Sequence, residues 1–282
     1  MNRVIDLISS GAEQLSRSVL DGRREAELLI EHVTGASRSE MYAAPDFKLE
    51  DTQVRRFQDL LDRRMRSEPL QYLTGTQSFR HLELVVGPGV LIPRPETEIV
   101  VERALALIEP IAAPNVLDVG TGCGAIAVSI ATEKAGAHVS ATDISGEALK
   151  WAEANFRALQ CDRVDLFRGD LFEPMPTGMK GSFDLIVSNP PYLTEQQVLS
   201  GPVDVRDHEP RLATVAGPTG LEVVKRLIDE LPQWLKPGGW IVLETWEGQA
   251  VHVSSLLSKS FTDLTLTRDL TGKVRVVEAR KP

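Results

Sequence analysis

Short apolar stretches alternate with amphipathic ones over the second half of the chain, and this alternation most restricts the folds open to it. From residue 115 onward, seven stretches have the pattern of strands, and helical patterns separate most of them. The predicted strands are Asn115–Val119, His138–Thr142, Val164–Arg168, Phe183–Ser188, Gly239–Glu244, Asp263–Thr267 and Val274–Ala279. The predicted helices are Ala125–Lys134, Gly146–Ala158, Gly220–Leu231 and Gln249–Ser258. No helix separates the last two strands, so we expect them to pair antiparallel. The pattern predicts a seven-stranded, doubly wound α/β sheet.

The first 75 residues have a different pattern, with apolar side chains at the three- and four-residue spacing of amphipathic helices. We predict helices over Arg3–Leu15, Arg23–Val33 and Glu50–Met65. A short hairpin or extended linker follows and ends in Gly87-Pro88-Gly89. The sequence therefore predicts a small all-helical domain over residues 1–75, a β-hairpin linker over residues 76–90 and the sheet domain over residues 91–282.

Composition excludes several classes of protein. The 31 basic and 40 acidic residues give a net charge of −9, which argues against nucleic acid as the main partner. No apolar stretch approaches the roughly 18–20 residues that a membrane span requires. Two cysteines are too few for a disulfide framework or a multi-cysteine zinc site. The first residues lack a signal-peptide cleavage pattern. We expect a cytoplasmic protein.

A glycine-rich turn directly follows the first strand of the sheet domain, in the order Gly120-Thr121-Gly122-Cys123-Gly124. Glycines allow a ligand to approach the main chain closely at such a turn. The acidic residue Asp143 ends the next strand, where its carboxylate can accept hydrogen bonds from both hydroxyls of a ribose. Because the loop also fits the pattern G-x-G-x-x-A, these residues alone leave NAD and S-adenosylmethionine both open. Asp170, after the third strand, is a candidate for holding an adenine amino group.

The fourth strand runs into Asn189-Pro190-Pro191-Tyr192. This position is at the carboxyl edge of the sheet, where open α/β folds bind ligands. Asn189 offers an amide oxygen, the Pro190 carbonyl a second acceptor, and Tyr192 a flat face for stacking. Two acceptors suit a planar, weakly nucleophilic NH2 group, whose nitrogen they would hold toward a sulfonium methyl group. The motif therefore favours methyl transfer to such a group, and dehydrogenases do not need it.

Other polar residues are weaker candidates. His208 stands among carboxylates, but methyl transfer from a sulfonium needs no metal, so we predict a charged loop on the substrate side and no metal site. Cys123 has no candidate partner for catalysis, and we interpret its side chain as packing within the loop.

With these motifs the chain resembles the HemK-type protein-(glutamine-N5) methyltransferases, which modify peptide chain release factors. The resemblance covers nearly the whole chain. It includes, besides the glycine loop and Asn189 to Tyr192, the segments Gln71–Gly75, Leu91–Glu98 (Leu-Ile-Pro-Arg-Pro-Glu-Thr-Glu), Glu209–Leu212 and Leu235–Gly239. The Leu91–Glu98 segment is the most specific marker, because adenine-N6 DNA methyltransferases share Asn-Pro-Pro-Tyr.

The resemblance implies a helical domain that helps to recognise the release factor and a second domain that binds S-adenosylmethionine. The substrate it implies is the glutamine of a Gly-Gly-Gln loop. Carried over residue by residue, Gly120 to Gly124, Asp143, Asp170, Leu171 and Asn189 line the cofactor site. Asn189 to Tyr192 hold the glutamine, and Asn189 is the catalytic residue. We expect a monomer with no nucleic-acid substrate and no membrane partner.

The sequence departs from the family pattern at two places. The fifth strand ends in Glu244-Thr245-Trp246 instead of Glu-Ile-Gly, and Ala213–Leu221 replaces a Gly-Gly-x-Asp-Gly-Leu stretch. Both departures are expected to reshape the rim of the pocket. Two other functions stay open from the residues. A nucleic-acid adenine methyltransferase would need a basic recognition domain, which is not evident. A binding module with an inactive methyltransferase fold is disfavoured by the intact Asn189 and Asp143.

Overall fold

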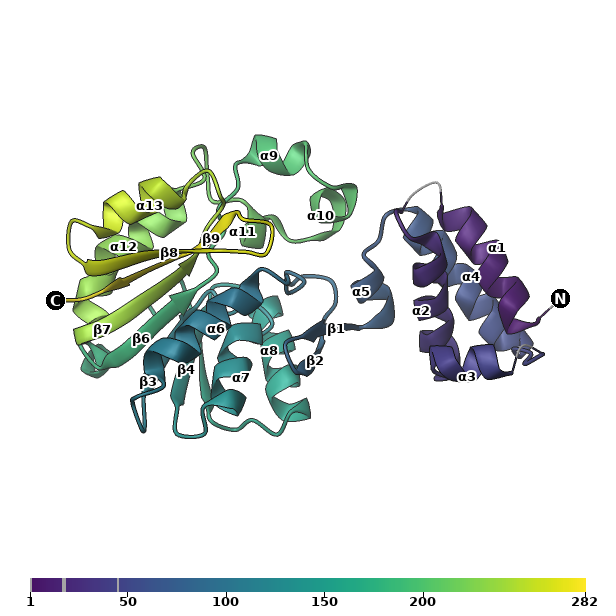
Figure 1. Ribbon diagram of the computed structural model, residues 1–282, viewed down its shortest axis with the longest axis horizontal. Coiled ribbons are helices and arrows are strands. Elements are labelled where there is room, and N and C mark those ends of the chain that lie inside the picture. Colours follow the sequence, from purple (N-terminus) through teal and green to yellow (C-terminus); the bar gives the residue numbers. More distant parts are fainter. Residues whose placement is uncertain (1, 17–18, 45) are drawn as a thin grey trace. The chain divides into compact units, whose positions relative to one another are not determined.

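The computed structural model describes residues 2–16, 19–44 and 46–282. The chain forms two compact units (Figure 1). The helical unit comprises Met1–Thr76 together with Pro202–His208, and the sheet unit comprises Gln77–Gly201 and Glu209–Pro282.

Among its described residues, the helical unit has five successive helices and one short helix from a distant part of the chain. They are α1 (Val4–Leu15), α2 (Gly22–Thr34), α3 (Arg38–Ala43), α4 (Asp51–Met65), α5 (Leu70–Thr74) and α10 (Val203–His208). Local signals set the ends of α2. The side chain of Asp21 accepts a hydrogen bond from the Arg24 N–H at its start, and Gly35 ends it in the left-handed region at a φ of 72°.

The core of this unit forms where α1 packs closely against α2 and α4. Gly11 allows this approach, because a Cβ atom there would lie 2.9 Å from the Phe57 ring. Ile8, Leu29 and Leu61 are buried in the same core. The amphipathic patterns that predicted the three long helices therefore correspond to one shared apolar interior.

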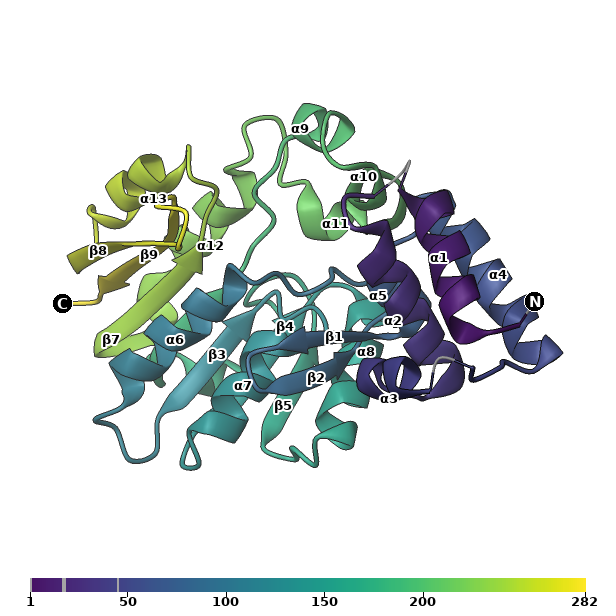
Figure 2. The same ribbon diagram turned by 45° about the vertical axis from the view of Figure 1, so that its right-hand side comes forward.

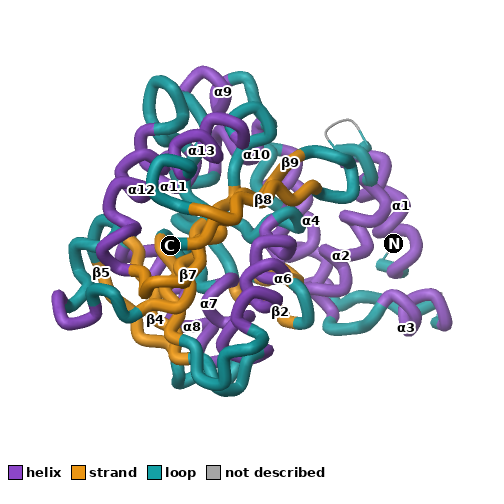
Figure 3. Tube along the Cα trace, turned by 60° about the vertical axis from the view of Figure 1, so that its left-hand side comes forward, coloured by secondary structure: helices purple, strands orange, loops and turns teal. Residues whose placement is uncertain are grey.

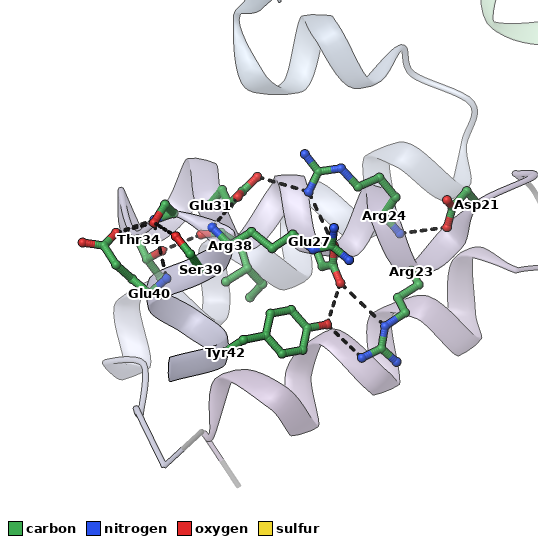
Figure 4. Close-up of polar contacts among 12 residues, drawn as sticks. Asp21, Arg23, Arg24, Glu27, Glu31, Thr34, Arg38, Ser39, Glu40 and Tyr42 are labelled. Carbon is green, nitrogen blue, oxygen red and sulfur yellow. Dashed lines mark hydrogen bonds and ion pairs between the residues drawn. The ribbon is translucent and has the colours of Figure 1, made fainter. Parts of the chain in front are cut away.

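Glu27 of α2 is a buried carboxylate within this unit, with an exposed side-chain fraction of only 1%. Its two oxygens lie 2.9 Å from Arg38 Nε and 2.6 Å from the Tyr42 hydroxyl, which donates to it. Arg23 and Arg24 add two further guanidinium groups within 4 Å (Figure 4). A buried carboxylate is stable only when it is paired and hydrogen-bonded, so this cluster fixes α3 against α2.

The sheet unit contains nine strands. They are β1 (Thr76–Phe79), β2 (Leu82–Val85), β3 (Asn115–Val119), β4 (His138–Asp143), β5 (Val164–Arg168), β6 (Phe183–Ser188), β7 (Leu235–Glu244), β8 (Thr262–Arg268) and β9 (Val274–Arg280). Its helices are α6 (Thr97–Ile108), α7 (Ala125–Glu133), α8 (Gly146–Ala158), α9 (Glu195–Leu199), α11 (Arg211–Thr214), α12 (Glu222–Trp234) and α13 (Ala250–Leu257), and a 3-10 turn, η1, spans Thr177–Met179.

Seven of these strands form one sheet in the order β5-β4-β3-β6-β7-β9-β8. The strands are drawn in orange in Figure 3. The first five in this order pair in parallel, whereas β9 pairs antiparallel with both β7 and β8. The predicted seven-stranded, doubly wound fold is confirmed. The insertion of β9 between β7 and β8 is not evident from the sequence, because β8 precedes β9 in the chain.

Alternate residues of the central strands face opposite layers of helices. Val116 belongs to the apolar cluster that includes α6, α7 and α8, whereas Leu117 belongs to the cluster that includes α12 and α13. Because both faces are covered, four of the five residues of β3 are buried. Apolar packing of this kind leaves the carboxyl ends of the strands as the place for polar chemistry.

The hairpin of β1 and β2 packs on α8 of the sheet unit (Figure 2). Asn155 of α8 connects them, since its Oδ1 accepts from the Val85 N–H at 2.7 Å and its Nδ2 donates to the Val85 carbonyl. The same Nδ2 donates to the Cys123 carbonyl at 2.9 Å. The hairpin is therefore tied through one buried amide to the glycine-rich loop.

Candidate functional site

A cavity of about 270 Å³ lies in the sheet unit at the carboxyl ends of β3, β4, β5 and β6. Its volume is close to the lower end of the range of roughly 300–1,000 Å³ that is typical of small-molecule sites. Nine of the predicted site residues line it: Gly120, Thr121, Gly122, Cys123, Asp143, Asp170, Leu171, Asn189 and Pro191. Gly124, Pro190 and Tyr192 are not among its lining residues.

The three glycines of the loop after β3 have different surroundings. All three have positive φ angles, of 74°, 59° and 84° for Gly120, Gly122 and Gly124. A Cβ atom on Gly120 would meet nothing within 4 Å, whereas one on Gly124 would lie 2.5 Å from the Phe156 ring. Gly120 thus leaves main chain open to the cavity, while Gly124 allows α7 to pack closely on α8.

Asp143 holds the loops after β3 and β4 together. Its Oδ2 accepts from the Gly122 N–H and its Oδ1 from the Ser145 N–H, both at 2.8 Å. Burial raises the pKa of this carboxyl, and the two backbone donors oppose that rise. Asp143 therefore presents an oriented carboxylate at the cavity wall.

Asp118, inside β3, fixes the base of the same loop, and no sequence motif indicates this role. Its Oδ2 accepts from the Thr121 hydroxyl at 2.6 Å and from the Ala127 N–H at 3.2 Å. The side chain is completely buried, and burial raises its pKa to about 7. A carboxylate this deep is recognisable only once the fold shows which strand is central.

Asp170 and Leu171 lie beyond β5 on another wall. The Oδ2 atom of Asp170 accepts from Arg226 Nη2 at 2.6 Å, and Arg226 of α12 also lines the cavity. Leu171 has a φ of 47°, in the left-handed region. Cys123 is buried in the loop, and burial raises the pKa of its thiol to about 12, so the thiolate is strongly disfavoured.

Asn189 follows β6 and faces the cavity beside Thr97, the first residue of α6. Its Nδ2 donates to Thr97 Oγ1 at 3.2 Å, and Thr97 in turn donates to Glu244 Oε2 at 2.6 Å. The Tyr192 hydroxyl donates to the other oxygen of Glu244 at 3.2 Å. Thr97 and Glu244 were not predicted as site residues. Thr97 lies in the Leu91–Glu98 segment of the resemblance, and Glu244 lies in the first departure from the family pattern.

Tyr192 and the first departure from the family pattern are joined in the structure. The Tyr192 ring stacks on the Trp246 ring with 6.4 Å between their centroids. The Arg275 guanidinium lies over the Trp246 ring, 5.6 Å from its centroid. In the second departure, Ala213 and Val215 line the cavity.

The family models match both parts of the chain. The model described as "PrmC N-terminal domain" matches residues 6–75, and the "Methyltransferase small domain" matches residues 99–202. The release factor glutamine methyltransferase of Koribacter versatilis is 38% identical over 260 residues, which are 92% of this chain and 91% of that protein. This chain belongs to the release factor glutamine methyltransferase family.

Another member of the family, from Streptomyces coelicolor, is 36% identical over 288 residues, which are 100% of this chain and 99% of that protein. Among solved structures, the 16S rRNA N2 G1207 methyltransferase of T. thermophilus in complex with AdoMet and guanosine is similar in fold. It has a TM-score of 0.56 and 20% identity, over 73% of this chain and 50% of that one. The resemblance found in the sequence is confirmed at the level of the family.

The described part of the chain shows neither a metal-binding cluster nor a membrane-spanning helix. Within it, no group of three or more His, Cys, Asp or Glu side chains is arranged to hold a metal ion, and His208 lies with its ring 3.4 Å from the Arg66 carbonyl. None of its helices combines the length and the apolar character that crossing a membrane requires.

Proposed function

We propose that this chain transfers a methyl group from S-adenosylmethionine to the side-chain amide nitrogen of the glutamine in the Gly-Gly-Gln loop of peptide chain release factors. One observation carries the proposal. A glycine loop of nucleotide-binding type and the Asn-Pro-Pro-Tyr motif border the same cavity, through Gly120 and Asn189. The release factor is taken from the names of the relatives.

The residues at the cavity fit the donor. Gly120 has no side chain to block main-chain contact, and Asp143 can accept from two ribose hydroxyls. Leu171, Thr121 and Cys123 form part of the wall, and Asp170 is a candidate for the adenine amino group. S-adenosylmethionine, when bound, supplies a methyl group on a positively charged sulfonium.

The chain's own contribution to the reaction is orientation. We assign Asn189 Oδ1 and the Pro190 carbonyl to the two N–H groups of the target amide, with Pro191 and Tyr192 shaping the site around them. Two acceptors in a fixed arrangement hold a nitrogen whose lone pair is delocalised and direct it for in-line displacement. No residue of the chain needs to form a covalent intermediate.

We also propose a role for the helical unit, with residues 1–75 as the domain that recognises the release factor and residues 76–90 as the hairpin linker to the methyltransferase domain, residues 91–282. We expect a monomer in the cytoplasm. Size-exclusion chromatography with light scattering tests the oligomeric state.

The direct test of function uses the purified chain with S-adenosylmethionine labelled in its methyl group. We expect label to enter a peptide chain release factor but not its variant with alanine in place of the loop glutamine. Duplex DNA and RNA provide the other arms. Labelling of either nucleic acid in preference to the release factor would replace this proposal with the adenine methyltransferase.

A further inference from the structure

Three polar side chains from three distant segments form a line that ends at the cavity. Asn189 Nδ2 lies 3.2 Å from Thr97 Oγ1, which lies 2.6 Å from Glu244 Oε2. Thr97 is 4% exposed and Glu244 is 3% exposed, so water does not compete for these contacts. The second oxygen of Glu244 is already engaged by the Tyr192 hydroxyl.

The chemistry of the groups sets the direction of every hydrogen bond in this line. When Glu244 is ionised, as it is above its pKa of about 7, its carboxylate only accepts, so both Thr97 and Tyr192 donate to it. A hydroxyl has one proton, and Thr97 has used it. Toward Asn189 it offers only lone pairs, so Asn189 must turn its NH2 group to Thr97. Its Oδ1 therefore points away from Thr97.

The two orientations of an asparagine amide have almost the same shape, so packing alone does not select between them. A flipped Asn189 would place its own NH2 group against the NH2 group of the target glutamine. It would also set its oxygen against the lone pairs of Thr97. Both contacts are unfavourable, and hydrogen-bond polarity is the means by which a buried site can exclude them.

We propose that Thr97 and Glu244 are positioning residues that hold the Asn189 amide with Oδ1 toward the target nitrogen. This inference rests on the proposed function, because it gives Asn189 its role as acceptor. Glu244 acts through Thr97 and has no direct contact with the substrate. Tyr192 completes the arrangement by satisfying the oxygen of Glu244 that Thr97 does not reach.

The test compares T97V with T97S in single-turnover methylation of the release factor. Valine has nearly the shape of threonine but no hydroxyl, so we expect the rate to fall by about 10- to 100-fold. Serine keeps the hydroxyl, and we expect it to restore most of the rate. S129A is the matched control: Ser129 is a fully buried residue of α7 whose hydroxyl donates to the Ala125 carbonyl, and its loss should leave the rate unchanged.

A double-variant cycle separates positioning from general loss of structure. Because Thr97 acts through Asn189, T97V should slow the N189A enzyme by less than about twofold. An equal slowing in the wild-type and N189A backgrounds would overturn the proposal, as would a T97V rate equal to wild type. If N189A itself has the wild-type rate, the acceptor role in the proposed function fails instead.

A readout independent of turnover is the side-chain amide of Asn189 in a nitrogen–proton correlation spectrum, assigned by its disappearance in N189A. In T97V its NH2 resonances should shift, because one proton loses its acceptor, while T97S should keep the wild-type shifts. Unchanged resonances in T97V would show that Thr97 does not hold this amide.

Discussion

Arg94 Nη2 lies 2.6 Å from Glu209 Oε2, and this ion pair joins segments that are 115 positions apart in the chain. The Glu209 side chain is 1% exposed, whereas Arg94 is 32% exposed. Neighbours of both residues, Pro93 and Pro210, line the cavity. The pair therefore holds two walls of the site together.

Replacing Arg94 with methionine should remove its guanidinium group from the buried Glu209 carboxylate. We expect a loss of about 2 kcal/mol of stability, reduced from the fully buried case because Arg94 is partly exposed. Denaturant unfolding measures this loss. R103M is a matched control. Arg103 Nη2 lies 2.8 Å from Oε1 of the equally buried Glu278, and neither residue lines the cavity. Similar destabilisation of both variants, with weaker S-adenosylmethionine binding only in R94M, is expected. Equal binding by the two variants would contradict the role of the pair at the cavity.

D143A should weaken binding of S-adenosylmethionine by about 1.5–3 kcal/mol, because a carboxylate that accepts from two hydroxyls makes charge-assisted bonds. The rate at saturating cofactor should change much less. Calorimetric titration measures the dissociation constant. Circular dichroism checks that the loss of the Asp143 contact with the loop after β3 has not disrupted the fold. An unchanged dissociation constant would remove Asp143 from the cofactor site.

N189A should reduce turnover by roughly 10²–10³, the usual loss for one oriented hydrogen-bonding group. Cofactor affinity should change less. N189D keeps an acceptor of similar shape and is expected to retain partial activity. Its charged carboxylate changes the hydrogen bond that Asn189 makes with Thr97 Oγ1. Single-turnover rates close to wild type in N189A would mean that another group positions the nitrogen.

Deleting residues 1–75 should leave S-adenosylmethionine binding largely intact and depress methylation of the intact release factor. The reason is that every residue lining the cavity belongs to the sheet unit. Circular dichroism must first show that the shortened chain is folded, because the segment Pro202–His208 belongs to the helical unit. A normal rate on the intact release factor would exclude the docking role.

The titration of Glu244 should lower the free energy of unfolding as pH rises. Burial raises its pKa to about 7, opposed by hydrogen bonds from Thr97 and Tyr192; Glu96 adds to the rise and Arg275 opposes it. In the unfolded chain the carboxyl loses its proton near pH 4.5, so between about pH 4.5 and 7 the native state binds more protons and stability falls with increasing pH. The change amounts to about 2–3 kcal/mol.

E244Q removes this titration, so its stability relative to wild type should increase by about that amount between pH 5 and pH 8. Asp118 titrates in the same direction but is present in both proteins, and the comparison cancels it. Urea unfolding at the two pH values measures the difference. A constant difference between the proteins would mean that Glu244 titrates normally in the fold.

The sequence by itself determined the fold class and the main groups at the cavity. Strand and helix periods depend on neighbouring residues, and residues that end parallel strands must meet at one edge of the sheet. The sequence alone therefore places Gly120, Asp143 and Asn189 near one another. Their assignment to cofactor and substrate stays a prediction.

The tertiary structure decided what supports these groups. Thr97 and Glu244 are 147 positions apart, and their contact depends on how α6 packs against the end of β7, which no local pattern encodes. The same holds for the order of β9 and β8, and for Gly124, whose bare Cα faces Phe156 instead of the cavity. Periodicity shows which face of an element is buried, but a hydrogen-bond partner is chosen by distance and direction in the folded chain, so only the fold could show what orients Asn189.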